Sequence, residues 1–378
     1  MKLVQIISDT NKSLAFEIIA DGFKRNHIKC HYILIQEKDS EFSRYLSSIG
    51  VEYSIIGLKN KVGILKTFIK IVKVLSKNKP KIVHTHLRTA SILGLLAAKL
   101  TRIPIRLHTR HHSTLNFNYY PSGVKYDKLI NLLSTHIISI SDVVTNVLVE
   151  KEKVNEKKIT VIPHGIHLER FKNVPQKRID LLQEKYHLKT HNGPFIGVIS
   201  RYIELKGIQY VIPAFKKYKA IYPDAHLVLA NAIGDYSDEV RYLLRTQLKI
   251  GDYTEVVFES DLYAFYQLFD IFIHVPVDEN VEAFGQTYIE ALAAGIPSIF
   301  TLSGIANQII TDNYNSIVVS FCSSNAIFEA LIELSKDKDK RDNLIVNGLK
   351  TVQDFSAEKY VQNHIKLYQE LCHQNVKN

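Results

Sequence analysis

Short apolar runs alternate with amphipathic stretches along the first part of the chain. Lys2–Ser8 (KLVQIIS) is almost continuously apolar, which is typical of a buried strand in a parallel sheet. Leu14–Arg25 follows with apolar residues at helical spacing, and Cys30–Ile35 (CHYILI) is a second apolar run. Strand, helix and strand in this order predict a doubly wound α/β unit.

The same alternation recurs further along, which predicts two α/β domains. More strands of the first series are expected at Lys81–Leu87, Pro104–His108, Ile137–Asp142 and Ile159–Pro163. A second series is expected at Phe195–Ser200, His226–Ala230, Val256–Ser260, Asp270–Val275 and Ser298–Thr301. A polar stretch near 172–193 separates the two series, so we expect an N-terminal domain over 1–170 and a C-terminal domain over 171–355. Residues 356–378 contain a final amphipathic helix candidate, Lys359–Leu371.

Composition fits two sizeable cores in a reducing compartment. The chain has 378 residues, of which 46% are hydrophobic, and its three cysteines (Cys30, Cys322 and Cys372) are far apart. This spacing argues against a disulfide framework and against a zinc site. Met1 leads directly into an apolar strand, so we expect no signal peptide, and the apolar segment Ala90–Leu100 is shorter than the roughly 20 residues of a membrane span. We therefore expect a cytoplasmic protein.

Positive charge is concentrated in the N-terminal part. Residues 1–110 hold 14 Lys and 6 Arg against 7 Asp and Glu, whereas the whole chain has a net charge of +10. Such a bias indicates an anionic partner, for which nucleic acid, an anionic membrane surface and an anionic acceptor are all candidates. Lys59–Lys81 predicts an amphipathic helix with many lysines, which suits either docking on anionic lipid or a core-packed helix with a solvated face.

One stretch in the second half, Val281–Pro297, combines features of a ligand site. Glu282 and Gly285 precede a segment with helical spacing that we expect to begin near Gln286, which places Glu290 on the second turn. A helix N-terminus offers free N–H groups to a diphosphate, and a glycine allows the backbone to come close to a ligand. The two carboxylates could accept hydrogen bonds from sugar and ribose hydroxyls. An ordinary amphipathic helix with two solvated glutamates is the alternative.

Two further clusters follow predicted strands. Arg201 comes directly after one strand and Lys206 begins the next helix, a spacing that favours a phosphate clamp over two unrelated surface cations. His111 and His112 lie in the segment HTRHHS after another strand, where parallel sheets bind ligands. No Asp, Glu or Cys completes a metal-binding set with these histidines, so we expect no metal there.

Together these motifs resemble those of the retaining glycosyltransferases of family 4, which have the GT-B fold. The segment EAFGQTYIE, from Glu282 to Glu290, resembles the family's E-x7-E motif. SRYIELKG, which contains Arg201 and Lys206, resembles its G-R…K-G pattern, and KIVHTH, HTRHHS, SISD and PHGI resemble further family segments. The first turn, from Ser8 to Ser13, differs because it lacks the family's glycines, and His164 stands where the family commonly has Asn.

The resemblance implies two Rossmann-like doubly wound parallel-sheet domains facing each other across a cleft, with the C-terminal helix returning to the first domain. It implies a retaining transfer of a sugar from a nucleotide-diphosphate sugar to a glycan or lipid-linked acceptor, as in surface polysaccharide synthesis, without a metal or other cofactor. The catalytic residues would then be His111, Glu282, Arg201 and Lys206, with His112 as the rival of His111 on the acceptor side. The donor-binding residues would be Glu290, Gly285, Gln286, Thr287 and Phe284.

Two other classes of function remain open at this point. One is a sugar-nucleotide epimerase or a phosphorylase of the same fold, although neither the extra acid and base carboxylates nor a pyridoxal-bearing lysine is evident. The other is a basic nucleic-acid-binding protein, which lacks a recognisable reader motif here. We therefore expect a peripheral association with the inner face of the membrane rather than nucleic-acid binding.

Overall fold

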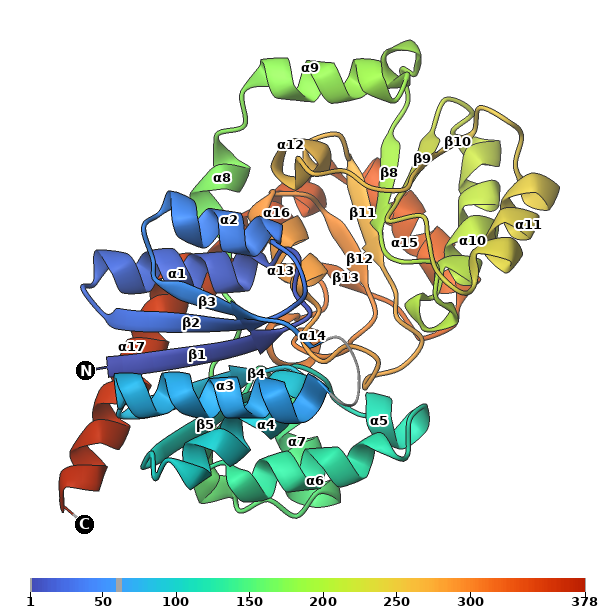
Figure 1. Ribbon diagram of the computed structural model, residues 1–378. Coiled ribbons are helices and arrows are strands. Elements are labelled where there is room, and N and C mark those ends of the chain that lie inside the picture. Colours follow the sequence, from blue (N-terminus) through green and yellow to red (C-terminus); the bar gives the residue numbers. More distant parts are fainter. Residues whose placement is uncertain (1, 59–62, 378) are drawn as a thin grey trace. The chain divides into compact units, whose positions relative to one another are not determined.

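The computed structural model describes residues 2–58 and 63–377, and the chain divides into two compact units (Figure 1). Unit 1 comprises Met1–Ile166 and Phe355–Asn378, and unit 2 comprises His167–Asp354. Within the described residues each unit contains one parallel sheet with helices on both faces. The predicted fold class, two Rossmann-like parallel-sheet domains, is confirmed.

The unit 1 sheet has seven strands among the residues that the structure describes. Their spatial order is β3 (Tyr53–Ile56), β2 (Lys29–Ile35), β1 (Lys2–Ser8), β4 (Ile82–His86), β5 (Ile105–Arg110), β6 (His136–Ser139) and β7 (Ile159–Val161). The helices are α1 (Leu14–Arg25), α2 (Glu41–Ser48), α3 (Gly63–Asn78), α4 (Arg88–Leu100), α5 (Leu115–Asn118), α6 (Gly123–Leu133), α7 (Asp142–Asn146) and α17 (Ala357–Lys377). The strand order reverses between β1 and β4.

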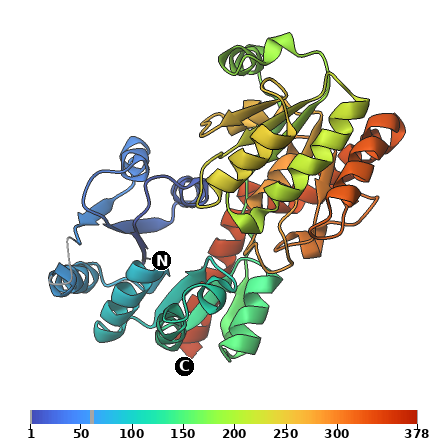
Figure 2. The same cartoon turned by 90° about the vertical axis from the view of Figure 1, so that its right-hand side faces the viewer.

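Helices α1, α2 and α17 pack on one face of this sheet, and α3 and α4 pack on the other. The C-terminal helix α17 lies beside α1 (Figure 2), where Val361 occupies the space above Gly22. Buried side chains of α17, including Tyr368 and Leu371, join those of α1 and of β1 in one core cluster. Burial of this much apolar surface ties the end of the chain to unit 1.

The unit 2 sheet has six strands among the described residues. Their order is β10 (Tyr253–Val256), β9 (His226–Ala230), β8 (Phe195–Ile199), β11 (Ile271–His274), β12 (Ser298–Phe300) and β13 (Ile317–Val318). The helices are α8 (Leu168–Lys172), α9 (Gln176–Lys185), α10 (Ile208–Ile221), α11 (Ser237–Gln247), α12 (Leu262–Tyr266), α13 (Gln286–Ala293), α14 (Ala306–Ile309), α15 (Ser324–Lys336) and α16 (Lys338–Thr351). Helices α10, α11 and α15 cover one sheet face, and the strand order reverses between β8 and β11 (Figures 1 and 2).

Several sequence predictions need correction at their boundaries. The strand predicted at Val256–Ser260 is wrong, because β10 ends at Val256. Val257 and Phe258, which look like strand residues, are 54% and 70% exposed. The helix predicted at Lys59–Lys81 is α3, Gly63–Asn78, and residues 59–62 lie outside the described part of the chain. The short strands β3 and β13 were not predicted, because neither carries a long apolar run.

Candidate donor site in unit 2 and histidine cluster in unit 1

The predicted cations and carboxylates of unit 2 follow the two strands at which the strand order reverses. Arg201 and Lys206 come after β8, and Glu282 comes after β11, its neighbour in the sheet. In open α/β sheets ligands bind at the carboxyl ends of the strands at this kind of switch point. The fold therefore places these side chains where a ligand is expected.

Glu282 is the best-anchored charge of this region. Its Oε1 accepts from Lys206 Nζ at 2.5 Å and from His274 Nε2 at 3.1 Å, and its backbone N–H donates to Ser303 Oγ at 3.0 Å. Burial alone would raise the pKa of Glu282, but the hydrogen bond from His274 and the positive charge of Lys206 outweigh it and lower the pKa to about 2. Glu282 is therefore a fixed anion at neutral pH.

Lys206 and Arg201 differ in how they are held. Lys206 belongs to a 3-10 turn, Glu204–Lys206, which packs on the end of β11 because the next residue is Gly207 with φ 73°. A Cβ at Gly207 would lie 2.0 Å from the carbonyl oxygen of Val275, so only glycine fits. Arg201 is exposed and has no side-chain partner among the described residues. Its guanidinium is therefore available to an incoming anion.

Glu290 lies on α13, as the spacing predicted, but in a different environment from Glu282. Its carboxylate accepts from Tyr266 Oη at 2.9 Å and from Gln286 Nε2 at 2.7 Å, and no cation is among these partners. Burial raises the pKa of Glu290 to about 7, although the two hydrogen bonds oppose the shift. A further hydroxyl donor would stabilise its charged form.

The segment before α13 is shaped by Gly285, which caps the helix with φ 84°. A Cβ there would lie 2.7 Å from the ring of Tyr288, so the turn requires glycine. Gln286 and Thr287 form the first turn of the helix and are half-buried. Phe284 is only 4% exposed, and its carbonyl accepts from the Ile305 N–H at 2.8 Å. Any contribution of Phe284 to a ligand is therefore through its position rather than an open side chain.

His274 belongs to this site and was missed by the sequence analysis. It lies in β11, its ring packs edge-on against Tyr288 at 4.7 Å between centroids, and it is 2% exposed. Its Nδ1 is buried and has no hydrogen-bond partner among the described residues. The available signal was a histidine inside the otherwise apolar segment IFIHV, eight residues before Glu282.

In unit 1, His111 joins a cluster of buried aromatic side chains. His111 Nε2 lies 3.2 Å from His86 Nδ1, and its ring stacks on that of His164 at 5.6 Å with 8° between the planes. His84 contacts His86 at 4.1 Å between ring centroids, and its two ring nitrogens each lie 2.7 Å from a hydroxyl, of Tyr368 and of Thr109. Burial lowers the pKa of His111 well below its ordinary value, and neighbouring histidines add to the effect.

The rival residue His112 is held by a different set of groups. Its Nε2 lies 3.2 Å from Asp127 Oδ2, and its carbonyl oxygen accepts from Arg110 Nε at 3.1 Å. Arg110 is fully buried and also pairs with Asp127 at 3.1 Å and with Glu152. This ion network fixes the backbone of the loop that carries both histidines. His112 is thus tied to a carboxylate, whereas His111 lies among neutral rings.

The glycine-free first turn of unit 1 reaches its conformation without glycine. Asp9 adopts a left-handed backbone with φ 49°, and its N–H donates to the Ile35 carbonyl at 3.2 Å. Ser13 then caps α1 through its side chain. The turn is therefore an ordered connection from β1 to α1.

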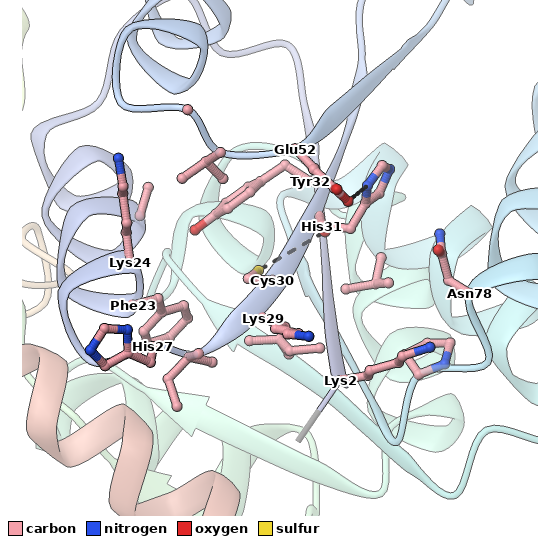
Figure 3. A pocket seen from close by; sticks show the side chains of 17 residues that line it. Lys2, Phe23, Lys24, His27, Lys29, Cys30, His31, Tyr32, Glu52 and Asn78 are labelled. Atoms are coloured by element: carbon pink, nitrogen blue, oxygen red, sulfur yellow. Dashed lines mark hydrogen bonds and ion pairs between the residues drawn. The ribbon is translucent and has the colours of Figure 1, made fainter.

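A cavity of about 540 Å³ lies at the amino ends of β1 and β2 in unit 1 (Figure 3). Lys2, Lys24, Lys29 and Glu52 are among the residues around it, and Cys30 and Tyr32 line its inner part. It contains none of the predicted site residues and lies at the edge of the sheet opposite to His86 and His111.

The described part of the chain contains neither a metal-binding cluster nor a membrane-spanning helix. No group of three or more His, Cys, Asp or Glu side chains there is placed to hold a metal ion. In residues 2–58 and 63–377, no helix combines the length and apolar character of a membrane span.

Comparisons with known proteins identify the family of this chain. The family model described as Glycosyl transferases group 1 matches residues 182–351, and that described as Glycosyltransferase Family 4 matches residues 19–170. The capsular polysaccharide biosynthesis glycosyltransferase CapM of Staphylococcus aureus is 27% identical over 339 residues, covering 86% of each chain. The alpha-monoglucosyldiacylglycerol synthase of Acholeplasma laidlawii is 26% identical over 334 residues, covering 83% of this chain and 81% of the relative.

The fold is likewise that of known glycosyltransferase structures. Anabaena HepE, solved in complex with UDP and glucose, superposes with a TM-score of 0.82 at 16% identity, covering 97% of this chain and 99% of HepE. These findings do not favour an epimerase, a phosphorylase or a nucleic-acid-binding protein. The chain belongs to the group 1, family 4 glycosyltransferases of the GT-B fold, and it is therefore a glycosyltransferase.

Proposed function

We propose that this glycosyltransferase takes its sugar from a nucleotide-diphosphate sugar and transfers it with retention at the anomeric carbon. The observation that carries the proposal is the group formed by Lys206, Glu282 and Arg201 at the strand-order reversal of unit 2. Two cations suit a diphosphate, and a fixed carboxylate beside them suits sugar hydroxyls. The HepE complex with UDP and glucose supports this assignment by analogy of fold.

In the proposed reaction the acceptor hydroxyl attacks the anomeric carbon from the face that the leaving group departs. The bond from that carbon to the diphosphate breaks, and the diphosphate oxygen takes the hydroxyl proton. Arg201 and Lys206 offset the charge that develops on the leaving group, and N–H groups of Gln286 and Thr287 add to this stabilisation. Glu282 orients the donor sugar and Glu290 the ribose. No metal is needed, since two cations already serve the phosphates.

The acceptor side of the site is assigned to unit 1. His111, with His112 as its rival, is assigned to the donor sugar or the acceptor hydroxyl by resemblance alone. The curated relatives are named for capsular polysaccharide and for a glycolipid, which supports a glycan or lipid-linked acceptor. We therefore propose a role in surface polysaccharide synthesis, in the cytoplasm at the inner face of the membrane.

Helix α3 supports a peripheral contact with an anionic membrane. Ile64, Leu65 and Ile69 are 42%, 66% and 44% exposed, and the neighbouring Lys66 and Lys70 are exposed as well. Apolar side chains between lysines are the pattern of a helix that lies in the headgroup region of anionic lipid. Of the two interpretations of this segment, lipid docking explains the exposed apolar residues better than core packing does.

A panel of nucleotide sugars tests the donor assignment. We expect a UDP- or GDP-sugar to raise the melting temperature, and the product of the active donor to keep the donor's anomeric configuration by NMR. No stabilisation by UDP-glucose, UDP-N-acetylglucosamine or GDP-mannose, with no transfer from any of them, would contradict the proposal. An inverted product would contradict only the retaining mechanism.

Flotation on liposomes with and without phosphatidylglycerol tests the membrane surface. We expect binding that requires the anionic lipid and weakens in L65S. V346S is the matched control, because Val346 in unit 2 is 65% exposed, close to the value for Leu65. Equal flotation of the two variants would remove α3 from the contact, and a salt-sensitive gel shift with RNA in place of flotation would favour nucleic acid.

A further inference from the structure

His274 contacts the ion pair of Lys206 and Glu282 in the donor site but is itself neutral in the ligand-free protein. Its Nε2–H donates to Glu282 Oε1, the same oxygen that accepts from Lys206. The other carboxylate oxygen of Glu282, Oε2, has no hydrogen-bond partner among the described residues. A sugar hydroxyl can therefore reach Glu282 while His274 keeps its own bond.

The ligand-free site carries a net charge of +1, whereas the loaded site carries −1. Lys206 and Glu282 neutralise each other, and Arg201 is the extra cation. A nucleotide sugar brings a diphosphate with two negative charges, so two cations then face three anions. Because the pair of Lys206 and Glu282 is mostly buried, this excess of negative charge is poorly screened by water.

We propose that donor binding is coupled to the uptake of one proton by His274, which becomes the third cation of the loaded site. The ammonium group of Lys206 moves toward the diphosphate, and the His274 imidazolium then neutralises the charge of Glu282. The proton comes from solvent and adds to Nδ1, the ring nitrogen that has no partner among the described residues. The inference rests on the proposed nucleotide-sugar donor and adds a group that compensates its charge.

The groups that face His274 favour this coupling. Glu282 from the following loop and Lys206 from the 3-10 turn are the charged groups in reach, and Tyr288 from α13 packs edge-on against the ring. In the ligand-free protein burial lowers the pKa of His274, although Glu282 opposes the shift. A diphosphate that draws Lys206 away removes a repelling charge and adds an attracting one, so both changes raise the pKa of His274.

Glu290 is the competing proton acceptor, since burial already raises the pKa of that carboxyl to about 7. The two sites differ in what the donor brings to them. A hydrogen bond donated by a ribose hydroxyl to Glu290 favours its charged form. The diphosphate, in contrast, favours the charged form of His274. Binding should therefore load a proton on the histidine and not on the glutamate.

Calorimetric titration of UDP-glucose and, separately, GDP-mannose at pH 7.0 tests the inference. Heats measured in PIPES, HEPES and Tris, which differ in ionisation enthalpy, give the number of protons taken up. A nucleotide sugar is the right probe because its diphosphate does not titrate near neutrality. We expect His274 to take up about half a proton or more, as linkage requires when a pKa rises through the working pH, and any proton that Glu290 releases is subtracted from this in the wild-type total.

Three variants locate the proton. H274Q keeps a donor near the Nε2 position but cannot titrate, so we expect binding without uptake and an affinity that no longer rises between pH 8.5 and 6.5. H226Q is the matched control, because His226 is also a buried strand histidine of unit 2, bonded to Thr254 at 2.8 Å, and should leave the uptake unchanged. E290Q cannot release a proton on donor binding, so it should show an uptake at least as large as that of the wild type.

The outcomes separate the inference from the proposed function. Binding of UDP-glucose or GDP-mannose to E290Q, in which Glu290 cannot release a proton, with no proton uptake between pH 6.5 and 8 overturns the inference alone, whether or not H274Q folds. Uptake that survives in H274Q and disappears in E290Q also overturns it. No binding of either nucleotide sugar counts against the proposed donor instead.

Discussion

The donor region of unit 2 and the histidine cluster of unit 1 are both largely buried, but the first contains charged side chains and the second contains neutral ones. In unit 2, burial opposes the charge of Glu282, but a lysine and a histidine contact it and lower its pKa to about 2. In unit 1, His84, His86 and His111 contact rings and hydroxyls, and burial lowers their pKa values well below the ordinary one. No carboxylate is among the causes of these three shifts.

The difference teaches that partners, not burial, decide whether a side chain is charged. Glu282 and Glu290 make the same point within unit 2, since a carboxyl with cationic partners has a pKa of about 2 and one with neutral partners about 7. The charged side chains of the unit 2 donor region suit a diphosphate. The neutral rings of the unit 1 histidine cluster suit the apolar faces and hydroxyls of a sugar. The predictions below change one partner at a time.

The largest effect is expected from K206A. Removing this cation leaves the leaving diphosphate with Arg201 alone, so kcat/KM should fall about 100- to 1,000-fold. K216A is the control, because Lys216 is an exposed lysine of α10 in the same unit. Steady-state rates with the active donor measure both variants, and a wild-type rate in K206A would remove Lys206 from the clamp.

E282Q should have the next largest effect. The amide keeps the shape of the side chain but loses the charge that Lys206 and His274 stabilise, so we expect a loss of about 10- to 100-fold in kcat/KM and weaker donor binding. Glu279 lies exposed in the same loop, which makes E279Q a matched control. Turnover and donor affinity that are both unchanged in E282Q would exclude Glu282 from the site.

E290Q tests the glutamate whose partners are neutral. The pKa of Glu290 is raised above its unfolded value, so between about pH 4.5 and 7 the folded protein binds more protons than the unfolded chain. The free energy of unfolding therefore falls as pH rises through this window. We therefore expect E290Q to be more stable than wild type by about 3 kcal/mol at pH 8 and by about 1 kcal/mol at pH 5. Urea denaturation midpoints measure this.

The same variant should weaken donor binding, because an amide is a poorer acceptor for ribose hydroxyls than a carboxylate. Stability gained with binding lost would show that the site keeps a destabilising group for function. If E290Q is less stable than wild type at pH 8, the pKa of Glu290 is not raised by burial.

Much of this fold was predictable because its strands are buried on both faces. Lys2–Ser8, Leu14–Arg25 and His226–Ala230 were predicted with their observed bounds, since the two strands are near-continuous apolar runs and the helix has apolar residues at helical spacing. Val257 and Phe258 misled the analysis because apolar residues on an exposed turn look like a strand. Exposure depends on what packs there, which a local pattern does not contain.

The candidate site was predictable only in part, for a related reason. Arg201, Lys206, Glu282 and Glu290 have spacings along the chain that a sequence shows directly. The ion pair of Lys206 with Glu282 joins residues 76 apart, and the support from His274 needs the ring to turn toward the same oxygen. His164 and His364 likewise reach the cluster around His111 only through the fold of unit 1. Such contacts follow from tertiary structure.

The smallest single effect is expected from H364Q, which removes one titrating group from the histidine cluster. Burial lowers the pKa of His364 to about 4, so folding favours the neutral ring, and stability is lost as pH falls from 6.5 toward 4. At pH 5.5 each such histidine costs about 1 kcal/mol relative to pH 7.5. Wild-type stability should therefore fall between these pH values, and H364Q should fall by about 1 kcal/mol less.

H373Q is the matched control, because His373 lies on the same helix and is exposed. Urea denaturation of the three proteins at pH 7.5 and 5.5 measures the difference, which does not depend on donor or acceptor. Equal losses in wild type and H364Q would mean that the cluster accepts protons without cost. The contrast between a charged unit 2 edge and a neutral unit 1 cluster would then fail on its unit 1 side, while the assignments of Lys206 and Glu282 would stand.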